Sequence, residues 1–249
     1  MPAFVNRFIL AAFVGVAAVC LALLLSHGAS QISLTMLCVL LLLAAAATLL
    51  NLSRSLPVQN IFAATVSIAL LSDLAQLAGL KAGCFVAPLS YLDAANHKLF
   101  NPFFTPFAWV IAILNSRGVA QQILRPWRNS PNYGLWGIGL TCALVFVLDA
   151  CLDIADWHID DWQATAACLV STVFIVVLAV PWLINKRPTP QPPPDWQPFI
   201  VWQTLNLLLA VAEAVHHAPS ATALHLIAGA IVGIAVTPIV SSRAVPASS

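Results

Sequence analysis

The sequence predicts an all-α protein, a polytopic transmembrane helix bundle of about eight spans that forms a single integral membrane domain over residues 1–249. Hydrophobic residues make up 61% of the chain and charged residues only 8%, and the mean hydropathy is +0.92. Apolar runs of about 20 residues, the length that crosses a bilayer as a helix, follow one another along the chain. These runs lack the period-two alternation of a membrane β-barrel strand, as Leu40 to Ala47 illustrates, so strands are excluded.

Eight apolar runs are the predicted spans. The first follows Arg7 and is longer than the apolar part of a secretion signal, so it is predicted to remain as a span. Residues 186–198 contain six prolines in thirteen residues and are predicted to form an extended cytoplasmic linker between spans six and seven. The predicted spans are residues 8–26, 32–52, 61–80, 103–124, 135–155, 164–184, 199–215 and 221–240.

The distribution of basic residues predicts the orientation of the bundle. Eight spans place both termini on one side, and eight of the ten Lys and Arg residues fall on that side, whereas only Lys81 and Lys98 fall on the other. Because cytoplasmic loops carry the excess of basic residues, both termini are predicted to be cytoplasmic, in a bacterial inner membrane. The net charge of +1 provides no field for binding nucleic acid, which is excluded as a partner.

Four acidic residues lie inside the predicted spans: Asp73, Asp149, Asp153 and Glu213. A charged side chain at the centre of a membrane helix costs about 2.5 to 3.5 kcal/mol on insertion scales, so these residues point to a function. At a rise of 1.5 Å per residue, Asp73 and Asp149 are expected roughly 10 Å below the outer surface. Asp153 and Glu213 are expected nearer that surface, so all four acids are predicted to lie in the outer half of the membrane.

Asp149, Asp153 and Trp157 follow i, i+4, i+8 spacing and therefore share one face of a helix. Two carboxylates that close, half out of water, are not expected to ionise together, so one is predicted to keep its proton and to be able to serve as a general acid. The structural alternative is that both acids form hydrogen bonds with neighbouring helices. Asp156, Asp160 and Asp161 are predicted to lie in a solvated acidic loop.

The histidines and cysteines predict no metal site. His225 lies one turn into the last span, and no two histidines have the i, i+4 spacing of a metal-binding pair. The six cysteines contain no C-x-x-C pair, and most lie inside apolar runs, where they are expected to fill helix contacts.

Several motifs follow one another over about 80 residues that start at Asp73. This acid is followed by two glycines and an aromatic residue in Gly79-Leu80-Lys81-Ala82-Gly83-Cys84-Phe85, and then by Pro88 and Tyr91. The loop into the next span follows with Leu99-Phe100, Pro102, Pro106 and Trp109. The run ends at Leu148-Asp149-Ala150-Cys151-Leu152-Asp153, which contains the pattern D-x-x-L-D. In this order the motifs resemble those of the membrane carotenoid hydratases, which include a bacterial 1,2-hydratase and an archaeal bisanhydrobacterioruberin hydratase.

The resemblance implies a hydro-lyase of carotenoid biosynthesis that adds water across a terminal double bond of an acyclic carotenoid. Such a reaction protonates the double bond to a tertiary carbocation and then delivers water, and it needs no cofactor. The implied catalytic residues are Asp73, Asp149 and Asp153. The predicted substrate-binding residues are of two kinds. Four are aromatic side chains whose ring faces can stabilise a cation, and the fifth is the remaining acid of the outer half of the membrane. They are Phe85, Tyr91, Trp109, Trp157 and Glu213. The expected partners are a lipid-soluble carotenoid or other isoprenoid and the lipid bilayer.

Three other classes remain open from the sequence. A membrane prenyltransferase would use Asp149-x-x-x-Asp153 to bind magnesium diphosphate, but it would also need a second acidic motif on a distant span, for which only Asp73 is available. A non-catalytic subunit that binds carotenoid or lipid would keep the aromatic residues without needing the acids. A transporter is the third class, although the paired broken spans of inverted repeats are not visible.

Overall fold

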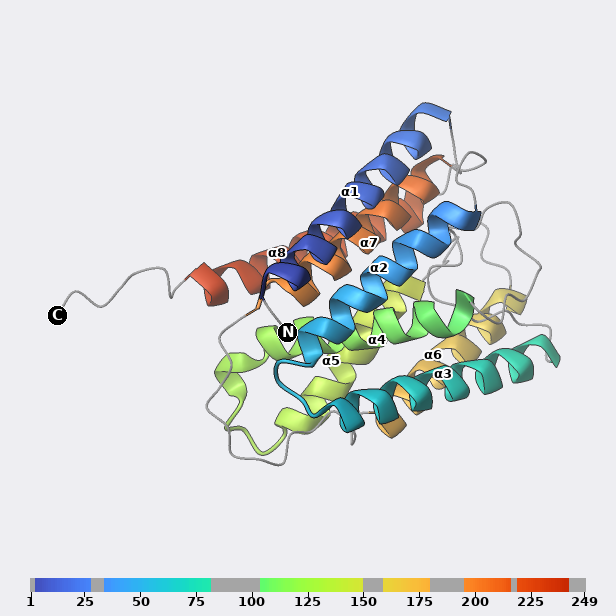
Figure 1. Ribbon diagram of the computed structural model, residues 1–249. Helices are drawn as coiled ribbons and strands as arrows, with labels where there is room; N and C mark the ends of the chain where they lie inside the picture. The colour runs from blue at the N-terminus through green and yellow to red at the C-terminus, as the bar shows by residue number, and fades with distance from the viewer. Residues whose placement is uncertain are drawn as a thin grey trace.

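The computed structural model describes residues 3–27, 34–81, 104–149, 159–179, 195–215 and 219–241, and all regular structure within these ranges is helical. Figure 1 shows that the helices run back and forth, so that the start of α1 and the end of α8 lie at the same end of the bundle. We refer to this as the terminal end and to the opposite one as the far end. The helices are α1 (Ala3–His27), α2 (Leu34–Leu52), α3 (Val58–Lys81), α4 (Phe104–Ile123), α5 (Tyr133–Asp149), α6 (Ile159–Ala179), α7 (Gln197–Val215) and α8 (Pro219–Ser241), with a short 3-10 turn, η3 (Arg125–Trp127), after α4.

The predicted all-α membrane bundle is confirmed, and each described helix overlaps one predicted span. Four of the helices are long and apolar enough to cross a bilayer: α1, α2, α3 and α7. Shorter apolar stretches lie in α5, α6 and α8. The bundle also exposes many large apolar side chains, such as Phe8, Leu42 and Ile234, which is the surface that lipid tails would cover.

Six of the described helices begin before their predicted spans, and the early starts of α6 and α7 change a prediction. The first turn of α6 contains Asp160 and Asp161, so the loop expected at these two positions is wrong. Asp156, the third acid of that prediction, lies outside the described residues. Acidic residues are favoured in the first turn of a helix because they complement the positive end of its dipole. The end of the predicted linker, Gln197 and Pro198, likewise belongs to α7, since proline is tolerated in a first helical turn.

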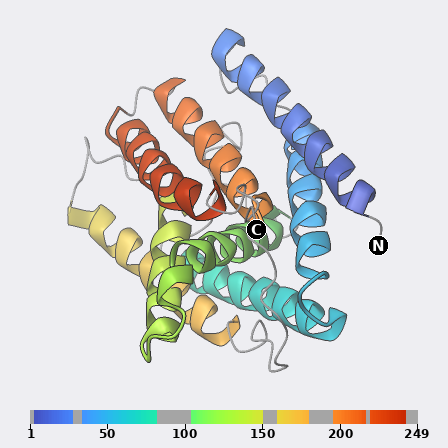
Figure 2. The ribbon, with the colours of Figure 1, turned by 90° about the vertical axis from the view of Figure 1, so that its left-hand side faces the viewer.

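The centre of the bundle is α4, which packs against α2, α3, α5, α7 and α8. Figure 2, viewed from the terminal end, shows α4 in the middle of the other helices. Every residue from Ala108 to Ser116 is buried, so this stretch is enclosed on all sides. A polar side chain in this position needs a partner, and Asn115 donates to Thr48 Oγ1 on α2 at 2.9 Å and to the carbonyl of Ile111 at 2.8 Å.

Amide side chains join four helices at the terminal end. Asn6 on α1 and Gln197 on α7 exchange hydrogen bonds through their side-chain amides, and Gln197 Nε2 also donates to the carbonyl of Ala47 on α2 at 2.7 Å. Gln122 on α4 donates to the carbonyl of Asp195 just before α7. These contacts fix where α7 begins against the helices that precede it in the chain.

Candidate functional site

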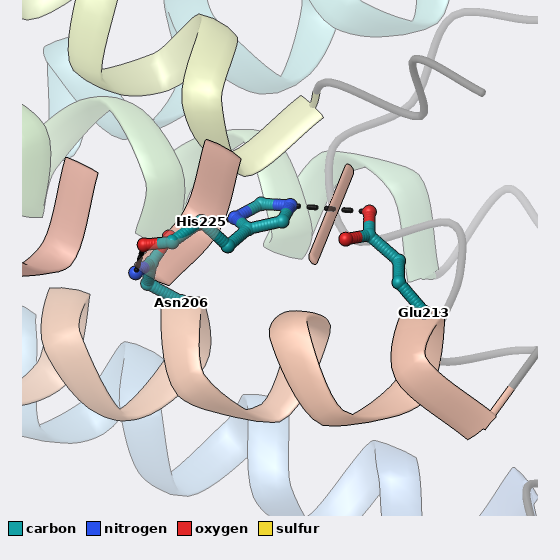
Figure 3. Close-up of polar contacts among 3 residues, drawn as sticks. All are labelled: Asn206, Glu213 and His225. Atoms are coloured by element: carbon teal, nitrogen blue, oxygen red, sulfur yellow. Dashed lines mark hydrogen bonds and ion pairs between the residues drawn. The ribbon is translucent and has the colours of Figure 1, made fainter. Parts of the chain in front are cut away.

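Three polar side chains meet between α7 and α8 in the half of the bundle nearer the far end. They are Asn206 and Glu213 from α7 and His225 from α8, and Figure 3 shows His225 lying between the other two. All three are buried, with exposed fractions of 2%, 1% and 1%. The cost of burying polar groups in an apolar bundle is offset only where they bind one another, so their partners determine what the cluster can do.

Asn206 fixes the orientation and the tautomer of the imidazole. Its Nδ2 donates to the main-chain carbonyl of His225 at 2.8 Å, and its Oδ1 lies 2.7 Å from His225 Nδ1. Because a carbonyl oxygen can only accept, the nitrogen of the Asn206 amide must face it, and Oδ1 must face the ring. Nδ1 therefore carries a hydrogen and donates it to Oδ1, which leaves Nε2 as the nitrogen that can gain or lose a proton.

His225 Nε2 lies 3.1 Å from Glu213 Oε1, and this contact is a hydrogen bond that becomes an ion pair when the ring is protonated. One proton lies between the two groups: either Nε2 donates to a carboxylate, or the protonated carboxyl donates to Nε2. In both arrangements the pair carries no net charge. A neutral pair is far less costly to hold in an apolar bundle than either charge alone.

The spacing of the two helices brings these residues together. Glu213 and His225 are each six residues from position 219, where α8 begins, so an antiparallel hairpin places them at the same depth. Asn206 is seven residues, or about two turns, before Glu213 and therefore lies on the same face of α7. At Gly229 on α8 the helices approach closely, because a Cβ there would lie 2.9 Å from Asn206 Nδ2.

Two acids near the far end have a buried oxygen that lacks a hydrogen-bond partner. Glu213 Oε2 and Asp73 Oδ1 both have this property in the described part of the chain. Buried polar atoms are rarely left unpaired in folded proteins, so each such atom needs an explanation, of which a contact with water or a ligand is one. The indole Nε1 of Trp109 on α4 is a buried donor with the same property.

The contrast between two buried tryptophans shows that the bundle can satisfy such a group. Trp109 and Trp202 are both fully buried, yet Trp202 Nε1 donates to the carbonyl of Leu144 at 3.3 Å and so links α7 to α5. Trp109 Nε1 has no corresponding acceptor among the described residues. Buried indoles usually find a partner, so an acceptor from outside the described chain would complete this one.

The predicted site residues divide into those that the structure describes and those that it does not. Asp73, Trp109 and Glu213 are described with their side chains, whereas Asp149 is described only as the last residue of α5. Phe85, Tyr91, Asp153 and Trp157 lie outside the described residues. The helices that carry Asp73 and Asp149 share two neighbours, because α4 and α6 each pack against both α3 and α5.

Sequence reasoning missed Asn206 and His225 as partners of Glu213. A single histidine and a single asparagine in two different spans show no pattern when each span is read alone. The available signal was the hairpin itself: a short connection between two spans and polar residues at equal distances from it. A second signal was the spacing of Gln203, Asn206, Ala210 and Glu213 on α7, which places one mainly polar stripe on a single face.

A comparison with protein families assigns the chain. The family model described as carotenoid biosynthesis protein matches residues 35–236, which include Asp73, Trp109 and the whole cluster between α7 and α8. The chain belongs to this family. No curated protein and no solved structure matches it. The carotenoid biosynthesis protein is therefore a helical membrane protein with apolar outer surfaces, which fit a lipid-soluble isoprenoid substrate and a lipid environment.

Proposed function

We propose that this carotenoid biosynthesis protein is a hydratase, which adds water across a terminal double bond of an acyclic carotenoid by acid catalysis. The observation that carries the proposal is Asp73, an acid in the span α3 whose buried Oδ1 has no partner among the described residues. An acid in such surroundings needs a reason to be retained, and protonation of an alkene in an apolar slot supplies one. The candidate proton donors are Asp73, Asp149 and Asp153.

The reaction makes two demands on the site. Proton transfer to the double bond forms a tertiary carbocation, which aromatic ring faces stabilise, and water then adds to that carbon. We assign the contacts with the carotenoid end to Phe85, Tyr91, Trp109, Trp157 and Glu213. Since the substrate is dissolved in the bilayer, it enters sideways between helices. With cytoplasmic termini, the site lies in the outer half of the membrane.

Expression in a host that makes an acyclic carotenoid tests this proposal, because hydration adds the mass of one water to the extracted pigment. Asp73→Asn, Asp149→Asn and Asp153→Asn each keep the size of the side chain and remove the proton, and loss of the proton donor lowers product formation by at least about 10²-fold. Asp195→Asn is the matched control. It makes the same chemical change at the terminal end, and its Oδ1 can still accept from the main-chain nitrogen of Gln197.

The expected result is a hydrated product from the unmodified protein and from Asp195→Asn, with a large loss in at least one of the other three variants. A protein that retains carotenoid during purification but never shifts its mass, in hosts that supply several acyclic ends, would contradict the proposal. That result would support the carotenoid-binding subunit instead.

A further inference from the structure

The second carboxyl oxygen of Glu213, Oε2, is a buried hydrogen-bond acceptor. Glu213 is 1% exposed, its Oε1 contacts His225 Nε2, and its Oε2 is buried without a partner in the described chain. If the shared proton lies on His225, Oε2 is a carboxylate oxygen; if it lies on Oε1, Oε2 is a carbonyl oxygen. In both cases Oε2 only accepts, so the group that completes it must bring an O–H or N–H.

We infer that Glu213 Oε2 binds the water that adds to the carotenoid carbocation and takes a proton from it, while His225 and Asn206 are positioning residues that hold the carboxyl in its acceptor form. The inference rests on the proposed hydration and deepens it by assigning the step that Asp73, Asp149 and Asp153 do not perform. Water is the reactant of that step that carries the missing O–H, and Glu213 has a buried second oxygen that can receive it while Oε1 stays bound to His225.

The protons balance across the cycle. The acid donates a proton to one alkene carbon, and the π pair forms the new C–H bond, which leaves a carbocation on the neighbouring carbon and a carboxylate on the acid. A lone pair of the bound water forms the C–O bond, and one O–H bond of that water breaks as its proton moves to Glu213 Oε2. The product is a tertiary alcohol, and the proton on Glu213 returns to the acid.

The contacts of His225 suit this role. With Nδ1 donating to Asn206, the ring can carry a second hydrogen on Nε2 and donate it to Glu213 Oε1, which stabilises the carboxylate without involving Oε2. The ring thus occupies one carboxyl oxygen and leaves the other open. Asn206 is itself held by the carbonyl of His225, so neither the amide nor the ring can turn without losing a hydrogen bond.

Deuterium labelling separates the water step from the acid step. Membranes that contain the protein are incubated in D₂O with an acyclic carotenoid. When the acid forms a carbocation that finds no activated water, its conjugate base removes a proton again, and the recovered alkene contains deuterium. Exchange into the starting carotenoid therefore reports on the acid, and the gain of one water reports on both steps.

Glu213→Gln is the principal variant. The new amide can donate to His225 Nε2 and present its carbonyl oxygen where Oε2 lies, so the hydrogen bonds persist and only proton acceptance is lost. We expect hydration to fall by at least about 10²-fold, while deuterium exchange stays within a few-fold of the unmodified protein. In Asp73→Asn, if Asp73 is the donor, hydration and exchange fall together; Asp195→Asn changes neither.

Each outcome decides a separate question. If Glu213→Gln hydrates the carotenoid at the rate of the unmodified protein, the inference is wrong. It is also wrong if Glu213→Gln loses both hydration and deuterium exchange while the protein still inserts into the membrane and retains pigment. Absence of both signals from the unmodified protein overturns the proposed function itself. If Glu213→Gln does not accumulate in the membrane, His225→Gln tests the same step: it removes the ring that holds Glu213 Oε1, and hydration is expected to fall while exchange remains.

Discussion

Replacing Gly229 by alanine tests the close approach on which the cluster between α7 and α8 depends. A Cβ at this position would lie 2.7 Å from Gln203 Nε2 and 2.9 Å from Asn206 Nδ2, closer than real Cβ contacts allow. The end of Gln203 can move aside, but Asn206 Nδ2 is held by the carbonyl of His225. The added methyl group is therefore expected to displace the Asn206 amide and to break both of its hydrogen bonds with His225.

The sign of the effect follows from two magnitudes. Alanine in place of a helical glycine gains about 1 kcal/mol, whereas the loss of two buried hydrogen bonds costs about 2 kcal/mol at about 1 kcal/mol each. Gly229→Ala is thus expected to destabilise the protein by about 1 kcal/mol, before any further cost of overpacking. Gly233, one turn further along α8, is the matched control because a Cβ there would meet nothing within 4 Å.

Thermal unfolding of the detergent-solubilised protein provides the measurement. The two variants are expected to differ by about 2 kcal/mol, and for a chain of this size about 1 kcal/mol shifts Tm by about 2 to 4 °C. Gly233→Ala is therefore expected to melt above the unmodified protein and Gly229→Ala below it. If Gly229→Ala proved as stable as Gly233→Ala, the helices would not approach as closely as described, and the assignment of hydrogen bonds to Asn206 would be wrong.

The remaining predictions concern the terminal end of the bundle and the orientation in the membrane. Gly118→Ala on α4 is expected to cost about 1 to 3 kcal/mol, because its Cβ would lie 2.6 Å from the Cβ of Pro198, which cannot move aside as a flexible side chain would. Gly139→Ala on α5, with nothing within 4 Å, is expected to gain about 1 kcal/mol as Gly233→Ala does, and the same unfolding assay compares the two variants. Reporter fusions after Asn51, Asn96, Asn129 and His158 are expected to alternate between cytoplasmic and outer readings. Cytoplasmic readings at both Asn96 and His158 would refute the predicted orientation.

The helices could be predicted from the sequence because a bilayer leaves few alternatives. Backbone groups in hydrocarbon must bond within their own segment, so a run of apolar residues of the right length becomes a helix. The described ends of α2 and α4 accordingly lie within two residues of the predicted ones. The start of α6 was missed, because Asp160 and Asp161 were interpreted by their charge rather than by their preference for a first helical turn.

Lateral packing could not be predicted in the same way. Hydropathy shows which segments enter the membrane, but not which helix lies at the centre, and α4 is central although its second half contains Asn115, Ser116 and Arg117. These residues are tolerated because neighbouring helices surround them, as the hydrogen bond from Asn115 to Thr48 shows. For the same reason Glu213 was recognised as an acid in a span, whereas its partners became apparent only once α7 and α8 were placed together.

The hydrogen bonds of the buried cluster distinguish a structural network from a reactive one. Asn206 and His225 already join α7 to α8 by exchanging two hydrogen bonds, which leaves only His225 Nε2 in need of a partner. Glu213 adds one bond to the ring and leaves its second oxygen buried and unpaired, at a cost that is typically about 1 to 3 kcal/mol. A side chain with a single polar atom at this position would satisfy His225 Nε2 and avoid that cost. The presence of an acid there is explained when the substrate step, rather than the fold, supplies the missing donor.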